Sequence, residues 1–89
     1  SIKTPDYIIK NDKFDLKEIR GNGKNTLDNA IKNQKKQASN FIFDITNTKM
    51  SVDEAIKQID NIYNSEHRNW VNRIILIKDN NVLKIYERK

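Results

Sequence analysis

The sequence predicts a single α+β domain spanning residues 1–89, in which two helices pack against a small, mostly antiparallel sheet. Three observations support this fold class. Apolar and polar residues alternate over residues 40–46, as in a strand with one buried face. Apolar residues recur at helical spacing after Ser51. Two strand-like runs, 71–78 and 82–88, are joined by Asp-Asn-Asn and predict a hairpin.

The first third of the chain is expected to form two strands and a helix. Residues 7–10 and 14–20 predict a hairpin, because the Asn-Asp-Lys between them suits a tight turn. Apolar positions from Thr26 to Ser39 follow helical spacing, and Asn25 or Thr26 can cap the start of that helix.

The remaining elements complete the predicted order strand, strand, helix, strand, helix, strand, strand. Ser51 and Glu54 have the spacing of a capping box, which places the start of the second helix there. This helix is expected to end near Ser65. The order ββαβαββ, with hairpins at both ends, is typical of helices covering one antiparallel sheet.

The composition favours an anionic partner. Seventeen Lys and Arg residues against twelve Asp and Glu give a formal net charge of +5, and such a surplus is common in proteins that bind nucleic acid. The chain has no cysteine, which excludes disulfides and thiolate metal sites. No apolar run approaches the ~20 residues that cross a bilayer. The chain begins at Ser1 without a methionine, which suggests a piece of a larger protein.

The only histidine, His67, is a candidate for acid–base chemistry. An imidazole titrates near neutral pH, so it can transfer the protons that cleavage of a phosphodiester requires. The alternative is an ordinary surface or core histidine. With one histidine and no cysteine, a zinc site is not expected.

Asp15 and Lys17 lie two positions apart in a predicted strand, so their side chains share one face. The Lys17 ammonium would neutralise charge that develops on a phosphorane. The alternative is a simple ion pair with Asp15, which contributes little when exposed. The arginines Arg20, Arg68 and Arg73 offer forked donors suited to phosphate.

Further polar residues could orient a phosphate or a base, or could instead serve as caps and turn contacts. They are Gln37, Asn40 and Thr46, together with Lys35 on the polar face of the first predicted helix.

A short motif, Pro5-Asp6 followed by Asp15-Leu16-Lys17, resembles the signature of the PD-(D/E)XK nucleases. This resemblance implies a divalent metal held by Asp6 and Asp15, with Lys17 helping to activate water. That fold normally has a helix and a strand before the motif, whereas four residues precede Pro5 here.

A longer pattern resembles another family over nearly the whole chain. The segments PDYII…FDLKEI, QKKQASNFIFDIT and WVNRIILIKDNNVLKIYERK resemble the C-terminal tRNase toxin domains of contact-dependent growth inhibition (CdiA-type) proteins, within the barnase/EndoU/colicin/RelE superfamily. The resemblance implies a cofactor-free, metal-independent ribonuclease. In the reaction of such an enzyme, a ribose 2′-hydroxyl of the RNA attacks the adjacent phosphate and gives a 2′,3′-cyclic phosphate.

Within this interpretation we assign roles to individual residues, and the resemblance implies the partners. His67 would transfer protons, Lys17 would face the phosphorane, and Asp15 would orient either of them. Arg73, Arg68 and Arg20 would hold phosphates, with Gln37, Asn40, Thr46 and Lys35 as supporting RNA contacts.

The partners would be tRNA, an acidic immunity protein and, as in some relatives, elongation factor Tu. Such a toxin is carried at the C-terminus of a secreted or cell-surface protein and acts in the target-cell cytoplasm. A third interpretation, besides the metal-independent ribonuclease and the metal-dependent nuclease, is an RNA-binding module without catalytic activity.

Overall fold

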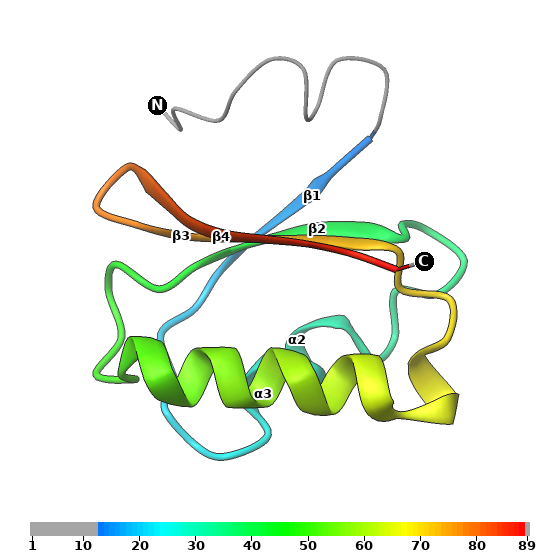
Figure 1. The fold of residues 1–89 in the computed structure, drawn as a ribbon, viewed down its shortest axis with the longest axis horizontal. Helices are drawn as coiled ribbons and strands as arrows, with labels where there is room; N and C mark the ends of the chain where they lie inside the picture. Colours follow the sequence, from blue (N-terminus) through cyan, green and yellow to red (C-terminus); the bar gives the residue numbers. More distant parts are fainter. Residues whose placement is uncertain (1–12, 89) are drawn as a thin grey trace.

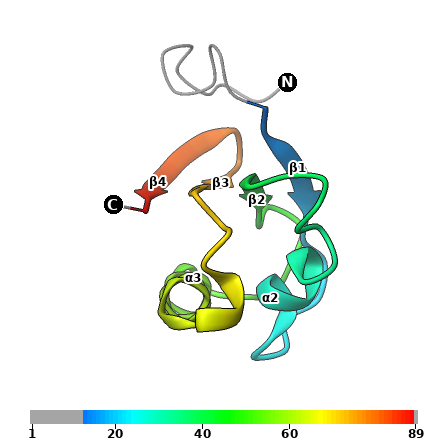
Figure 2. The same cartoon turned by 90° about the vertical axis from the view of Figure 1, so that its right-hand side faces the viewer.

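The computed structural model describes residues 13–88, which form a four-stranded sheet with both helices on one face (Figure 1). The elements follow the order β1 (Asp15–Glu18), α2 (Thr26–Ile31), β2 (Asn40–Asp44), α3 (Val52–Asn64), the 3-10 helix η1 (Glu66–Arg68), β3 (Arg73–Lys78) and β4 (Asn81–Glu87). Viewed along the strands in Figure 2, α2 lies under the β1 side of the sheet and α3 under the β4 side. The α+β class and the two helices are therefore confirmed.

The sheet is mixed, which corrects the expectation of a mostly antiparallel one. In the sheet order β1-β2-β3-β4, β1 pairs with β2 and β2 with β3 in parallel, and only β3 and β4 are antiparallel. Each parallel pair is joined through a helix that returns the chain to the edge where the first strand began. The alternation of apolar residues is the same in both strand directions, so it could not reveal this. The expected strand at residues 7–10 lies outside the described residues.

The main core lies between the sheet and the helices. Phe41, Phe43 and Ile45 from the β2 segment are fully buried there, as the alternation predicted. Ala55, Ile59 and Ile62 from α3 and Leu27 and Ile31 from α2 cover them. A smaller cluster of Ile42, Ile75 and Ile77 occupies the opposite face of the sheet. The central strand β3 is therefore buried on both faces, which explains its nearly continuous apolar sequence.

Local sequence signals explain where α3 begins and where the β3–β4 hairpin turns. The Ser51 hydroxyl accepts a hydrogen bond from the Glu54 backbone N–H at 3.0 Å, which is one half of the predicted capping box. The Glu54 carboxylate accepts from the Gln58 side chain at 2.9 Å. Asp79 and Asn80 have φ values of 52° and 63°, which build the tight turn between β3 and β4. Asp and Asn tolerate this left-handed conformation better than most residues.

The first helix is shorter than predicted. It ends at Ile31, and residues 32–38 continue as turns, although a helix to Ser39 was expected. After Ile31 the next apolar residue is Ala38, so the intervening turn has no apolar side chain to pack on the core. Asn25 precedes the helix but makes no side-chain cap. Instead, the Leu27 N–H donates to the Gln58 side chain of α3 at 3.0 Å.

Candidate functional site

Asp15 and Lys17 lie on the helix-facing side of the edge strand β1. Their register partners on β2 are Phe41 and Phe43, both core residues of that face. The Lys17 Nζ lies 3.1 Å from Asp15 Oδ2, and the side chains are 24% and 34% exposed. Partial burial strengthens this ion pair relative to one on an open surface and restricts where the ammonium can move. The shared face that alternation predicted is therefore present.

A pocket of about 220 Å³ adjoins this pair. It is lined by Lys13, Phe14 and Asp15 at the start of β1 and by Gln34, Gln37 and Ala38 from the turns after α2. The fold thus brings the predicted residues Asp15 and Gln37 to one pocket. Lys35 lies in the same turn segment and is exposed to solvent.

Asn40 and Arg73 lie at the same edge of the sheet, where β2 and β3 begin. The buried Asn40 amide donates to the Lys13 carbonyl at 3.3 Å and accepts from the Arg73 backbone N–H at 3.2 Å. Asn40 therefore ties the starts of three strands together. The Arg73 guanidinium pairs with Glu87 at the end of β4, at 2.8 Å. We call the edge of the sheet where β1, β2 and β3 begin the strand-start edge, and in Figure 2 this edge faces the viewer.

His67 lies in η1 with an exposed side chain. Its backbone carbonyl accepts hydrogen bonds from Trp70 Nε1 at 2.9 Å and from Arg68 Nη1 at 3.1 Å. The Trp70 ring meets Phe41 edge to face, with centroids 6.1 Å apart, and Phe41 is the register partner of Asp15. His67 is thus connected to the strand-start edge through Trp70. No hydrogen bond or ion pair within residues 13–88 joins its imidazole to Asp15 or Lys17.

Arg68 is engaged in a structural contact. Its guanidinium makes a two-pronged ion pair with Asp28 of α2, with distances of 2.7 and 3.0 Å, and its side chain is 17% exposed. This pair fastens η1 to α2. A phosphate at Arg68 would have to compete with the Asp28 carboxylate.

Arg20 and Thr46 lie at the opposite edge, because each follows the end of a parallel strand. Arg20 is exposed and pairs with Glu18. The Thr46 hydroxyl donates to Asp44 at 2.6 Å and accepts from the Asp79 N–H at 2.8 Å, so it closes a turn. The fold therefore separates these two predicted contacts from the strand-start edge.

Arg88 is a residue whose importance the sequence did not indicate. Its guanidinium donates to the carbonyls of Val71, Arg68 and Tyr63, at 2.7, 3.0 and 3.4 Å. It also lies over the Tyr63 ring, 4.9 Å from the centroid. Arg88 therefore anchors the end of β4 to the segment that carries η1.

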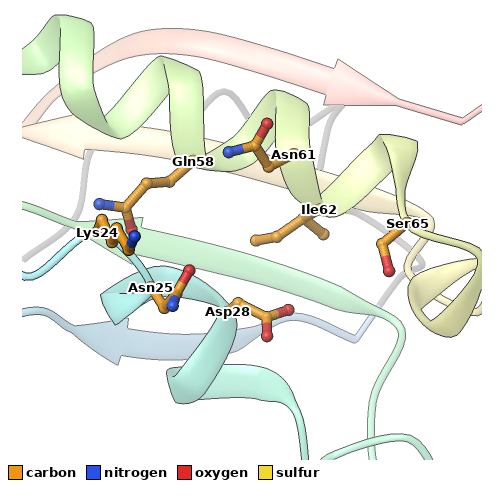
Figure 3. Close-up of a pocket in the computed structure, with 7 residues that line it drawn as sticks. All are labelled: Lys24, Asn25, Asp28, Gln58, Asn61, Ile62 and Ser65. Atoms are coloured by element: carbon orange, nitrogen blue, oxygen red, sulfur yellow. The ribbon is translucent and has the colours of Figure 1, made fainter.

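Two further pockets lie outside the predicted site. One, of about 200 Å³, lies between α2 and α3 and includes Asp28 and Gln58 (Figure 3). The other contains the stacked rings of Tyr63 and Tyr86. Burial, reinforced by Asp60, raises the pKa of Tyr86 to about 12. Burial also raises the pKa of Tyr63, against the opposing effect of Arg88.

The metal-site alternative depends on Asp6, which lies outside the described residues. Between residues 13 and 88 there is no group of three or more His, Cys, Asp or Glu side chains that could hold a metal ion. The second acid of that motif, Asp15, is paired with Lys17. In the same part of the chain, no helix is both long enough and apolar enough to cross a membrane.

Comparison with known proteins gives one family. The model of the contact-dependent growth inhibition CdiA C-terminal domain matches residues 3–82, which is most of the 89-residue chain. No curated protein and no solved structure matches the chain. Arg88 lies beyond the matched range.

Proposed function

The chain belongs to the CdiA C-terminal domain family of contact-dependent growth inhibition, and from this premise we propose that it is a metal-independent ribonuclease that cleaves tRNA. Domains of this family are toxins, commonly nucleases, that are carried at the C-terminus of CdiA and delivered into target cells. The family implies a cognate immunity protein. The proposal adds the substrate, the reaction and the residues.

The observation that carries the proposal is the partly buried Lys17–Asp15 pair beside a pocket in a basic protein. The Lys17 ammonium lies 3.1 Å from the Asp15 carboxylate, which holds it in place before substrate arrives. An ammonium has three N–H donors, so Lys17 can keep this contact and still donate to a phosphate oxygen. A fixed cation stabilises charge that develops in a transition state more effectively than a mobile one, because less reorganisation is needed. Gln37, which lines the adjoining pocket, can donate to a phosphate oxygen there.

The proposed reaction is an intramolecular transesterification. The ribose 2′-oxygen forms a bond to phosphorus as the bond from phosphorus to the 5′-oxygen breaks. The 2′-hydroxyl loses a proton and the leaving 5′-oxygen gains one. His67 transfers protons, and Lys17 balances the charge on the phosphorane oxygens. The products end in a 2′,3′-cyclic phosphate and a 5′-hydroxyl.

The partners follow from the same proposal. A tRNA would lie along the strand-start edge, where Arg73 and Lys35 add positive charge. The immunity protein would be acidic, because complementary charge speeds association with a basic toxin. As in some relatives, elongation factor Tu carrying tRNA would be a further partner.

Paired substitutions test the role of Lys17. We expect Lys17→Met to lower the rate of tRNA cleavage by roughly 10²–10³-fold, the usual cost of removing a transition-state contact. Lys57→Met, at an exposed position of α3, is the matched control and should retain full activity. Equal activity of the two variants would contradict the role of Lys17.

His67 is tested separately. We expect His67→Ala to abolish cleavage while the thermal midpoint stays nearly unchanged, because the side chain is exposed. Full activity in this variant would refute the proton-transfer role.

A further inference from the structure

A pocket of about 410 Å³ lies between α3 and β4, away from the Lys17–Asp15 pair. It is lined by Asp60 and Tyr63 from α3 and by Tyr86, Glu87 and Arg88 from the end of the chain. The two tyrosine rings stack with centroids 5.9 Å apart and an interplanar angle of 23°. This volume is large enough for a nucleobase with part of its ribose.

The two tyrosine hydroxyls differ in their hydrogen bonding. The Tyr63 hydroxyl donates to the Asn72 carbonyl at 2.9 Å. The Tyr86 hydroxyl is buried and has no hydrogen-bond partner among residues 13–88. A buried polar group without a partner costs about 1–3 kcal/mol, so native proteins rarely retain one without a reason. An incoming ligand group can supply the missing partner.

The charged residues around the pocket differ in whether they have partners. The Asp60 carboxylate makes no ion pair or hydrogen bond within residues 13–88, whereas Glu87 is paired with Arg73. The Arg88 guanidinium is engaged with three carbonyls. The exposed Lys84 lies over the Tyr86 ring, 5.1 Å from its centroid. The pocket thus combines the unpaired Asp60 carboxylate, the unpaired Tyr86 hydroxyl and the ammonium of the exposed Lys84 side chain.

We propose that this pocket binds a nucleobase carrying an exocyclic amino group, as a second RNA subsite; the inference rests on the ribonuclease function proposed above. The amino group would donate to Asp60, and the Tyr86 hydroxyl would pair with a neighbouring ring nitrogen or carbonyl. Lys84 would contact the phosphate attached to that nucleotide. Uracil fits less well, because it has no amino group and its one donor on that edge, N3–H, lies between two carbonyl oxygens that a carboxylate repels.

The pocket lies close enough to the proposed active site to act on the same RNA. Glu87 lines the pocket and pairs with Arg73, and the Arg73 backbone is hydrogen-bonded to Asn40 at the strand-start edge. A strand bound at that edge can therefore reach the pocket. A cationic side chain of a protein partner fits less well, because each tyrosine ring already has a cation over it, Lys84 over Tyr86 and Arg88 over Tyr63.

The test uses oligonucleotides that cannot be cleaved, since a 2′-O-methyl group blocks the attacking oxygen. Fluorescence anisotropy would compare 2′-O-methyl hexacytidylate with 2′-O-methyl hexauridylate, a pair matched in charge and ring size. We expect the cytidine oligomer to bind about five- to tenfold more tightly, the value of one well-made hydrogen bond. Asp60→Asn and Tyr86→Phe should each reduce this preference, while the exposed Asp53→Asn on the same helix should preserve it.

Equal binding of the two oligomers by the wild type would overturn the inference, and so would a preference that survives in both pocket variants. Amide shifts at Tyr86 on adding N-acetyl-arginine amide, with none on adding either oligomer, would also overturn it and assign the pocket to a protein partner. Cleavage of tRNA is measured separately. Cleavage without a base preference refutes only the subsite, whereas a base preference without cleavage refutes only the nuclease.

Discussion

Replacement of Gln58 by methionine should destabilise the domain severely, although the two side chains have similar size. Gln58 is 3% exposed and lies on α3, facing the start of α2 (Figure 3). Its side-chain oxygen accepts from the Leu27 N–H at 3.0 Å, and its amide donates to the Gly23 carbonyl and to Glu54, both at 2.9 Å. One side chain thus caps one helix from another.

The loss of unfolding free energy in Gln58→Met depends on whether each hydrogen-bond partner of Gln58 can bond to water instead. The N–H of the fully buried Leu27 would lose the acceptor that Gln58 provides, at a cost of about 1–3 kcal/mol. Gly23 is exposed and Glu54 half-buried, so both can turn to water and each loses about 0.5–1 kcal/mol. The sum is roughly 2–5 kcal/mol, which corresponds to a fall in melting temperature of about 8–40 °C for a domain of this size.

Thermal melting followed by circular dichroism, together with urea titration, measures this change. Lys57→Met introduces the same side chain one position earlier, at an exposed site, and should change stability by no more than about 0.5 kcal/mol. If Gln58→Met costs less than about 1 kcal/mol, the Gln58 contacts do not hold α2 to α3 and the reasoning is wrong.

Three further predictions concern β4 and its contacts with α3 and the segment that follows it. Tyr63→Phe should lower the free energy of unfolding by about 1 kcal/mol in urea titrations, because its hydroxyl is bonded, whereas Tyr86→Phe should leave it unchanged or raise it. The raised pKa of Tyr86, about 12 against an ordinary 10, stabilises the fold below pH 10, and this contribution is lost as the pH rises toward 12. Urea titrations at pH 9 and pH 11 should therefore show a smaller decline for Tyr86→Phe than for the wild type. Arg88→Met should cost roughly 2–3 kcal/mol, since three carbonyls lose a charged donor; a melting temperature equal to that of the wild type would show that Arg88 does not anchor β4.

The sequence predicted those parts of the fold that depend on neighbouring residues. Alternation identified the apolar face of β2, the pair Ser51 and Glu54 located the start of α3, and Asp79-Asn80 marked the turn before β4. Strand direction was not predictable in the same way, because period-two patterning is independent of direction. The mixed sheet follows from how the helices connect the strands.

The same distinction applies to the candidate site. Asp15 and Lys17 are two residues apart, so their shared face follows from strand geometry. The pair of Arg68 with Asp28 spans forty residues. Nothing local to either residue indicates such a contact, which is why Arg68 was expected to bind phosphate. The separation of Thr46 from Asn40 likewise depends on which ends of the strands meet at each edge.

The most direct test of the proposed function is incubation of the purified domain with total bacterial RNA, with and without EDTA, resolved on a denaturing gel. We expect discrete tRNA fragments in both lanes, each 5′ fragment ending in a 2′,3′-cyclic phosphate. Fragments that disappear with EDTA would contradict the metal-independent mechanism and favour the metal site at Asp6 and Asp15. Intact RNA in both lanes would contradict the ribonuclease altogether.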